Sequence, residues 1–212
     1  METMEKIISA NQLTFEQLRK ETKILDNNGE PLLMYNRSKE DFENFELGKR
    51  NLKETKIGLN HFGFFFSSSK NLEQYGSFIK ERYLNIKNPL DLRDLGFRTE
   101  YKSFRKKLTD LGIPDKELAG YDLAFQEHNI NRNKKLGSRS GIYSPKSEIL
   151  QPMNETRMAT FNFFDVGEGF YLRKLLESKG IDGVIFEDEA DVTAVAFYPE
   201  QIIEPEYALS KT

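Results

Sequence analysis

Tyr75 lies near the end of a run of aromatic and polar residues that could bind a flat, polar ring. The run, residues 63–76, places three phenylalanines before three serines and ends in Gly76. It predicts a buried strand that stops abruptly and then one short helix of about two turns, because serine hydroxyls bond locally and glycine ends helices. A second strand is expected over residues 78–86. Tyr75 and Phe65 would then offer flat faces at the mouth of a strand pair, where an aromatic ligand could stack.

Composition limits the other chemistry that is open to this chain. It has 212 residues, which favours one domain, and a formal net charge of -3, which argues against a general nucleic-acid coat. It has no cysteine, so a disulfide framework, a thiolate nucleophile and thiolate metal sites are excluded. Its two histidines, His61 and His128, lack metal-ligand spacing. With no apolar run of about 20 residues and no signal peptide, we expect a soluble cytoplasmic protein that does not cross a membrane.

The N-terminal part predicts a helical extension followed by the main domain. Thr14 and Gln17 fit a capping box, so a helix is expected over residues 15–22. The turn-forming residues 26–31 mark the boundary before a short strand at 32–35. The expected organisation is an extension over 1–30, a domain over 31–205 and a tail over 206–212.

Helical spacing dominates the middle of the chain. Apolar residues favour helices over residues 101–111 and 115–127, within a helical insertion at about 91–165. The stretch 126–141 is basic and rich in Asn, Ser and Gly, which predicts a mobile loop. A last helix at 169–178 and an antiparallel hairpin over 181–198 complete the expected elements.

Five motifs, taken in order, resemble the ADP-ribosyltransferase domains of polyvalent phage and mobile-element proteins, in the branch similar to poly(ADP-ribose) polymerases. They are residues 33–38, 63–75, 83–90, 181–185 and 196–202. The resemblance covers about residues 31–205 and is weakest over 91–165. It implies an α+β fold with two small antiparallel sheets framing an NAD cleft.

The resemblance also implies a reaction and a set of site residues. The family splits NAD at the nicotinamide–ribose bond and passes ADP-ribose to an acceptor, using a histidine, a tyrosine and a glutamate. Tyr75 falls on the tyrosine, and Phe65 on the aromatic position before it. Asn36 stands where the histidine is expected, and Thr193 stands where the glutamate is expected.

The remaining candidates lie beside these positions. Tyr35, Arg37, Ser38 and Ser67 are interpreted as cofactor-binding residues together with Asn36, Phe65 and Tyr75. Asn36 can still bond a ribose hydroxyl, whereas Thr193 carries no charge. In the polymerase-like arrangement, Asn36 and Thr193 are expected to face the same cleft as Tyr75.

An alternative follows from the arginine-serine-glutamate branch of the same superfamily. Arg37 and Ser67 would then act with one acidic residue of the hairpin tip, which is Glu187, Glu189 or Asp191. Successive strand residues face opposite sides, so Arg37 and Asn36 cannot both point into one cleft unless the strand bends.

Two functional hypotheses remain open. The first is an enzyme that transfers ADP-ribose from NAD to a protein or nucleic-acid acceptor, as a phage or mobile-element effector in the host cytoplasm. The second is a degenerate domain that binds NAD, ADP-ribose or a partner protein without chemistry. Neither the acceptor nor the oligomeric state follows from the sequence.

Overall fold

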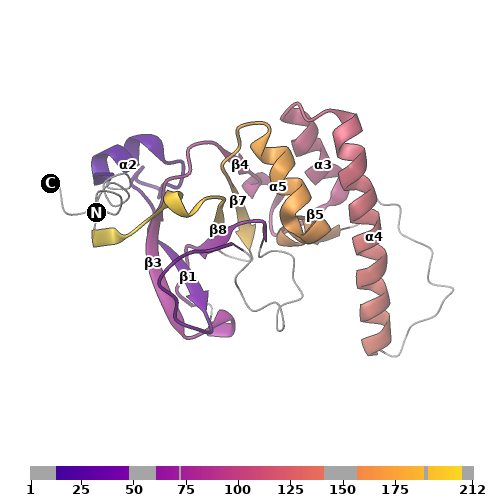
Figure 1. Ribbon diagram of the computed structural model, residues 1–212, viewed down its shortest axis with the longest axis horizontal. Helices are drawn as coiled ribbons and strands as arrows, with labels where there is room; N and C mark the ends of the chain where they lie inside the picture. Colours follow the sequence, from indigo (N-terminus) through magenta and orange to yellow (C-terminus); the bar gives the residue numbers. More distant parts are fainter. Residues whose placement is uncertain (1–12, 48–60, 72, 141–156, 189–190, 207–212) are drawn as a thin grey trace, which may run out of the picture. The chain divides into compact units, whose positions relative to one another are not determined.

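The aromatic run at residues 64–67 forms a central strand of a seven-stranded sheet (Figure 1). The strand order is β4-β7-β8-β2-β1-β3-β9; β4 and β7 run parallel, and the other neighbours run antiparallel. The strands are β1 (Met34–Ser38), β2 (Phe64–Ser67), β3 (Phe78–Leu84), β4 (Pro89–Asp91), β7 (Gly183–Asp188), β8 (Asp191–Ala196) and β9 (Ile202–Ile203).

The computed structural model describes residues 13–47, 61–71, 73–140, 157–188 and 191–206, with the side chains of 131–140 and 167–168 outside the description. The chain forms two compact units. Unit 1 comprises Met1–Leu47, Gly63–Asp91 and Ile181–Thr212, and unit 2 comprises Gly48–Phe62 and Leu92–Gly180. Unit 1 contains the seven-stranded sheet and every site residue that the sequence predicts.

One face of the sheet in unit 1 packs on an apolar cluster. Along β1, burial alternates, so that Met34, Asn36 and Ser38 are buried and the residues between them are half-buried. This alternation is the period of two that a strand with one covered face requires. The cluster consists of Ile24, Met34, Phe64, Phe66, Leu84, Ile86, Ile185, Ala194 and Ala196.

The segment after β1, residues 39–46, has no regular secondary structure. Its Phe45 lies against the apolar cluster, with its ring centroid 5.6 Å from that of Phe64 and 5.4 Å from that of Phe66. An irregular segment therefore contributes an aromatic ring to the packing of the sheet.

The sheet is weakly joined between β1 and β2. Only one residue pair, Tyr35 with Ser67, is in register there, whereas β1 and β3 share five pairs from Met34–Arg82 to Ser38–Phe78. The amide of Asn36 crosses this seam and donates to the carbonyl of Phe65 at 2.8 Å. The strands therefore form one mixed seven-stranded sheet, narrowest in pairing between β1 and β2, in place of the two small antiparallel sheets that the resemblance implies.

The helix expected near the N-terminus is confirmed as α2 (Phe15–Glu21). Its capping box is complete: the Gln17 amide donates to the Thr14 hydroxyl at 3.2 Å, and the Thr14 amide donates to the Gln17 side chain at 2.9 Å. Leu18 is fully buried, and the Thr22 hydroxyl donates to the carbonyl of Leu84 at 2.6 Å. These contacts make α2 part of unit 1.

Unit 2 is largely helical, so the predicted α+β class is confirmed. A two-stranded sheet, β5 (Arg98–Glu100) with β6 (Arg157–Ala159), accompanies the helices. The helices are α3 (Tyr101–Asp110), α4 (Asp115–Ser140), the 3-10 segment η7 (Thr160–Gly169) and α5 (Phe170–Glu177). No helix among the described residues is both long and apolar enough to cross a bilayer.

Stacked aromatic rings fill the core of unit 2. Phe104 of α3 stacks on Phe163 with ring centroids 4.5 Å apart, and Tyr101 stacks on Phe125 of α4 at 4.0 Å. The Tyr121 hydroxyl is buried and donates to the carbonyl of Phe163 at 2.6 Å. The helical spacing predicted for α3 and α4 therefore describes a packed core.

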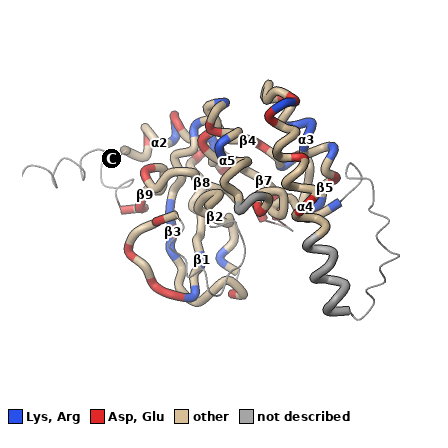
Figure 2. Tube along the Cα trace, turned by 45° about the vertical axis from the view of Figure 1, so that its right-hand side comes forward, with Lys and Arg blue, Asp and Glu red and all other residues tan. Residues whose placement is uncertain are grey.

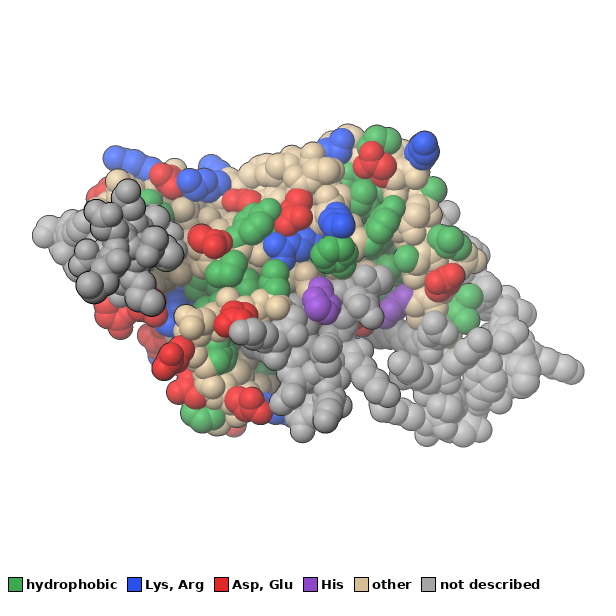
Figure 3. All heavy atoms as spheres, viewed as in Figure 1, with side chains coloured by type: hydrophobic (Ala, Val, Ile, Leu, Met, Phe, Trp, Pro, Cys, Tyr) green, Lys and Arg blue, Asp and Glu red, His purple; other side chains and the backbone are tan. Residues whose placement is uncertain are grey.

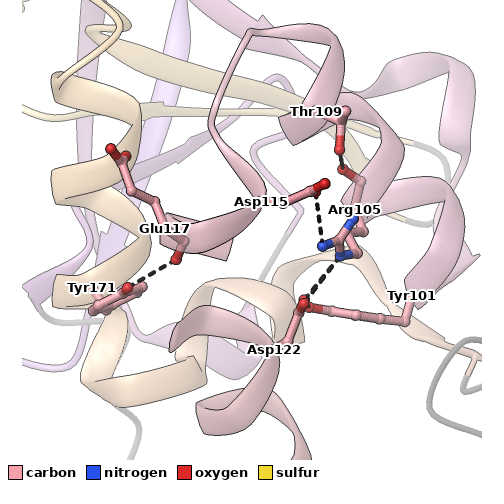
Figure 4. Close-up of polar contacts among 7 residues, drawn as sticks. All are labelled: Tyr101, Arg105, Thr109, Asp115, Glu117, Asp122 and Tyr171. Carbon is pink, nitrogen blue, oxygen red and sulfur yellow. Dashed lines mark hydrogen bonds and ion pairs between the residues drawn. The ribbon is translucent and has the colours of Figure 1, made fainter. Parts of the chain in front are cut away.

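A polar network ties α3 to α4 beside this core (Figure 4). The Tyr101 hydroxyl donates to Asp122, and Arg105 contacts the same carboxylate at 3.1 Å and Asp115 at 3.3 Å. Burial and the bond to Asp122 raise the pKa of Tyr101 far above its ordinary value. Helix α3 carries four basic residues and one acidic residue, and carboxylates pair with all four basic side chains, Lys102, Arg105, Lys106 and Lys107. Charges of both signs are visible at this helix in Figure 2.

The prediction of a loop at residues 126–141 is wrong for residues 126–140. Helix α4 continues to Ser140, well past the expected end at 127, and residue 141 lies outside the described residues. Once a helix has nucleated, each further residue adds one backbone hydrogen bond at little cost. The packed N-terminal half of α4 therefore continues as helix through residues 126–140, although these residues are mostly polar.

Candidate active site

Three neighbouring strands bring together five of the predicted site residues. Tyr35 of β1 is opposite Ser67 of β2, and Ser67 is opposite Thr193 of β8. Residues directly opposite in an antiparallel pair share a face, and alternation along each strand adds Arg37 and Phe65. We call these five residues the site face.

The three serines after β2 have different roles. Ser67 is 5% exposed and its oxygen accepts a hydrogen bond from the Ser69 amide at 3.1 Å. Ser68 continues the pairing with β8: its amide donates to the Val192 carbonyl at 2.8 Å, and the Val192 amide donates to its hydroxyl at 3.1 Å. Ser69 accepts from the amide of Asn71 at 3.1 Å. Only Ser67 belongs to the site face.

Thr193 has a hydroxyl without a hydrogen-bond partner among the described residues. The residue is 7% exposed and lies in register with Ser67. The Thr193 oxygen is not among the fully buried polar atoms that lack a partner in the described residues, so it remains accessible. An accessible hydroxyl can both donate to and accept from a polar group of a ligand.

Arg37 binds the main chain of the segment that follows β2. Its Nε donates to the carbonyl of Lys70 at 2.7 Å, a terminal nitrogen donates to the carbonyl of Gly76 at 2.9 Å, and the other terminal nitrogen also contacts Lys70. Three of the five guanidinium N–H groups are thus directed at backbone oxygens.

Gly76 brings the same segment against the end of β1. Its φ is 139°, and a Cβ at this position would lie 2.0 Å from the carbonyl oxygen of Ser38. Both the backbone angle and the close approach therefore require glycine. Together with Arg37, Gly76 fixes the chain on both sides of Tyr75.

Tyr75 lies at the end of a single 3-10 turn, η3 (Glu73–Tyr75), and is 53% exposed. The expected two-turn helix is therefore wrong. Arg37 donates to the carbonyls of Lys70 and Gly76, which lie on either side of this turn. The ring of Tyr75 is largely accessible on the loop beside the site face.

Asn36 does not share the face of Thr193, so the expectation of one common cleft for the two residues is wrong in this register. Alternation places Asn36 with Met34 and Ser38, on the side of the apolar cluster. Its Nδ2 donates to Phe65, while its Oδ1 is buried without a partner among the described residues. Ser38, on the same side, donates to the carbonyl of Glu40 at 2.5 Å.

The acidic hairpin tip is divided between the two faces of the sheet. Asp188 is opposite Asp191, and alternation places both carboxylates on the side of Thr193. Glu187 is opposite Val192 and faces the other side. Of the three acids considered for the alternative triad, Asp191 has the register of the site face, and Glu189 lies outside the described residues.

Lys70, in the segment after β2, lies beside the site face and was not predicted from the sequence as a site residue. Its ammonium lies 5.0 Å from the centroid of the Tyr35 ring and 2.5 Å from the carboxylate of Glu81 on β3. The hydrogen bond to Glu81 raises the pKa of Lys70. One face of Tyr35 is thus covered by a cation. No sequence spacing signals this contact, because Lys70 lies in the irregular segment after β2 and Glu81 lies on β3.

Neither histidine forms part of a metal centre within the described residues. Figure 3 shows the two histidine side chains, in purple, as separate patches. No group of three or more His, Cys, Asp or Glu residues in the described part of the chain could hold a metal ion.

The α+β fold, with its seven-stranded mixed sheet and these motifs in this order, is consistent with an ADP-ribosyltransferase-like domain. The model of one family, described as ADP-ribosyltransferase in polyvalent proteins, matches residues 26–204, so the chain belongs to this family. The resemblance that the motifs predicted is confirmed. Comparisons with curated proteins and with solved structures gave no match.

Proposed function

We propose that the chain transfers ADP-ribose from NAD to a protein or nucleic-acid acceptor. The observation that carries this proposal is the register of Ser67 with Thr193 beside a loop that is fixed around Tyr75. Two hydroxyls and an accessible aromatic ring are suited to a ribose and a nicotinamide, since a hydroxyl donates and accepts and a ring stacks. As a phage or mobile-element effector, the protein would work in the host cytoplasm.

In the proposed reaction, the bond between nicotinamide and C1′ of its ribose breaks as a nucleophile of the acceptor bonds to C1′ and loses its proton. Tyr75 and Phe65 would flank the nicotinamide, and Ser67 and Thr193 would bond the ribose. Asp191 is the nearest candidate along β8 for a negative charge that opposes the developing positive charge, since it shares the side of Thr193.

A second function is favoured by one observation. Thr193 occupies the position that the resemblance gives to a glutamate, and a neutral hydroxyl stabilises an oxocarbenium-like centre less than a carboxylate does. A domain that binds NAD, ADP-ribose or a partner without catalysing a reaction would need the Tyr75 ring and the hydroxyls of Ser67 and Thr193. It would not need a glutamate at position 193.

Incubation of the protein with NAD labelled in its adenylate part and a cell lysate tests the two functions. Transfer predicts labelled protein or nucleic acid together with released nicotinamide. Binding alone predicts a measurable affinity for NAD or ADP-ribose with neither product. Absence of binding and of both products would contradict both proposals.

Matched variants connect the result to the site. Tyr75→Ala is expected to weaken NAD binding by about 1–3 kcal/mol, the range for loss of stacking on a base. Tyr198→Ala removes another exposed tyrosine of unit 1, 40% exposed and outside the site face, and should leave binding unchanged. Equal affinities of the folded Tyr75→Ala variant and the parent would remove Tyr75 from the site.

A further inference from the structure

The loop that carries Tyr75 is held to the sheet by one side chain at its two ends. Arg37 reaches the carbonyl of Lys70 with two nitrogens and the carbonyl of Gly76 with a third. Arg37 is half-buried at the C-terminal half of β1, in register with Ile79 of β3. A planar guanidinium fixes two acceptors in direction as well as in distance, because its donors form a rigid fork.

Close packing adds a second constraint on the same loop. The backbone of Gly76 lies so near Ser38 that no Cβ fits between them. The Lys70 side chain adds a third contact through Glu81, on the strand next to β1. The loop therefore lies against β1 and β3, with Tyr75 immediately before the second anchored residue.

We propose that Arg37 is a positioning residue: it sets the place of Tyr75 by clamping residues 70–76 to β1, and it does not itself bind the phosphates of the ligand or act as a catalytic group. A guanidinium that donates to two main-chain oxygens has fewer donors left for a phosphate. Its loss would release the loop and displace the ring. The inference rests on the proposed function only for the ligand, NAD, because the clamp itself consists of contacts within the chain.

The first experiment measures the clamp without any ligand. Hydrogen exchange is compared for the amides of residues 70–76 in the parent and in Arg37→Met, Arg37→Lys and Gly76→Ala, with the amides of 194–196 in β8 as an internal reference. Arg37→Met and Gly76→Ala should each raise exchange at 70–76 by 10-fold or more and leave 194–196 unchanged. Arg37→Lys should give an intermediate value, since an ammonium cannot fork onto both carbonyls.

Arg82→Met is the matched control for removing an arginine from this sheet. Arg82 lies on β3 in register with Met34, on the side of the apolar cluster, donates to the main-chain carbonyl of Glu81 at 2.7 Å and pairs with Glu204 at 3.0 Å, and neither of these two contacts is to residues 70–76. Its loss should not change exchange at 70–76. Because the chain has no tryptophan, a Tyr75→Trp parent supplies a fluorescence signal from the loop alone, and Arg37→Met in that parent should shift its emission.

The second experiment asks whether Arg37 acts through Tyr75. NAD affinity is measured for Arg37→Met, Tyr75→Ala and the double variant. A positioning role predicts that each single change weakens binding by about 5- to 150-fold, as loss of one stacking contact does, and that the double variant is no weaker than Tyr75→Ala. If Arg37 instead contacts a phosphate directly, the fold-losses of NAD affinity in the two single variants should multiply in the double variant.

The outcomes separate this inference from the proposed function. If exchange at 70–76 responds as expected but no variant binds NAD, the clamp stands and the proposed ligand is wrong. Unchanged exchange at 70–76 in folded Arg37→Met overturns the clamp, as does a loss of protection that extends equally to 194–196. Multiplying losses in the double variant overturn the assignment of Arg37 as a positioning residue.

Discussion

Thr193 is 7% exposed, lies opposite Ser67 on the site face, and has a hydroxyl that bonds none of the described residues. A carboxylate there would lie beside Ser67 and would stabilise positive charge on a ribose as it forms. Thr193→Glu is therefore expected to raise NAD turnover, by up to about 10²-fold to 10³-fold, the size of the effect of one preorganised polar group. Release of nicotinamide gives the rate, and Thr193→Gln is the control of the same shape without charge. A folded Thr193→Glu variant that turns over NAD more slowly than the parent would contradict this.

Adding Asn36→His to Thr193→Glu should not raise the rate further. Asn36 faces the apolar cluster and its amide crosses the seam to Phe65. Losing that bond would lower the free energy of unfolding by about 0.5–1.5 kcal/mol. Thermal or urea unfolding of the double and single variants measures the difference. A faster double variant with unchanged stability would indicate that the side chain can turn to the site face.

Asp191 and Glu187 form a matched pair on one hairpin, because alternation places them on opposite faces of the sheet. If Asp191 supplies the charge that Thr193 lacks, Asp191→Asn should lower nicotinamide release by about 10²-fold or more, and Glu187→Gln should leave it near the parent value. Equal rates for the two variants would exclude a role for this carboxylate. If the domain binds NAD but does not catalyse a reaction, both Asp191→Asn and Glu187→Gln should leave NAD affinity unchanged.

At the scale of elements, local signals in the sequence were sufficient where the stabilising contact is itself local. The capping box of Thr14 and Gln17 and the hairpin of β7 and β8 were predicted because their partners are a few residues apart. The faces of Asn36 and Arg37 were not, because they depend on the register of β1 against β2, and a shift of one residue exchanges the faces. The site residues could thus be identified from the sequence, but the face of the sheet on which each one lies could not.

Proline substitutions can test helix α4, whose C-terminal half was predicted from its composition to be a loop. Proline at Ile130, within the helix, removes a backbone donor and clashes with the preceding turn, so Ile130→Pro should destabilise α4 by about 3 kcal/mol. Lys116→Pro, in the first turn, should be tolerated. Circular dichroism and thermal unfolding measure both. Equal tolerance of the two prolines would mean that residues near 130 do not require helical backbone in solution.

At alkaline pH, the stability of the molecule should decrease because of two buried tyrosines in unit 2. Burial raises the pKa of Tyr121, and burial together with Asp122 raises that of Tyr101, above the ordinary value of 10.0. A group whose pKa is raised by folding contributes fully below its unfolded pKa and loses that contribution as pH rises above it. The free energy of unfolding should therefore be constant with respect to these groups below about pH 9 and fall above about pH 10.

Tyrosinate absorbance against pH, with unfolding monitored in parallel, checks this dependence. Some of the nine tyrosines should ionise only as structure is lost. Tyr121→Phe removes one buried titrating group and should reduce the slope of stability against pH above 10. Ionisation of all tyrosines with native structure retained would contradict the expected linkage.

The clamp has a consequence for how this protein can change during evolution. The hydrogen bonds of Arg37 within the described part of the chain all go to carbonyl oxygens, which every amino acid carries, so they do not constrain the identities of Asn71, Glu73 and Gln74. Substitutions at these positions would alter the chemistry next to Tyr75 while the loop keeps its path. Under the proposed function, point mutations in this loop would therefore change the acceptor without any change in the strands beneath.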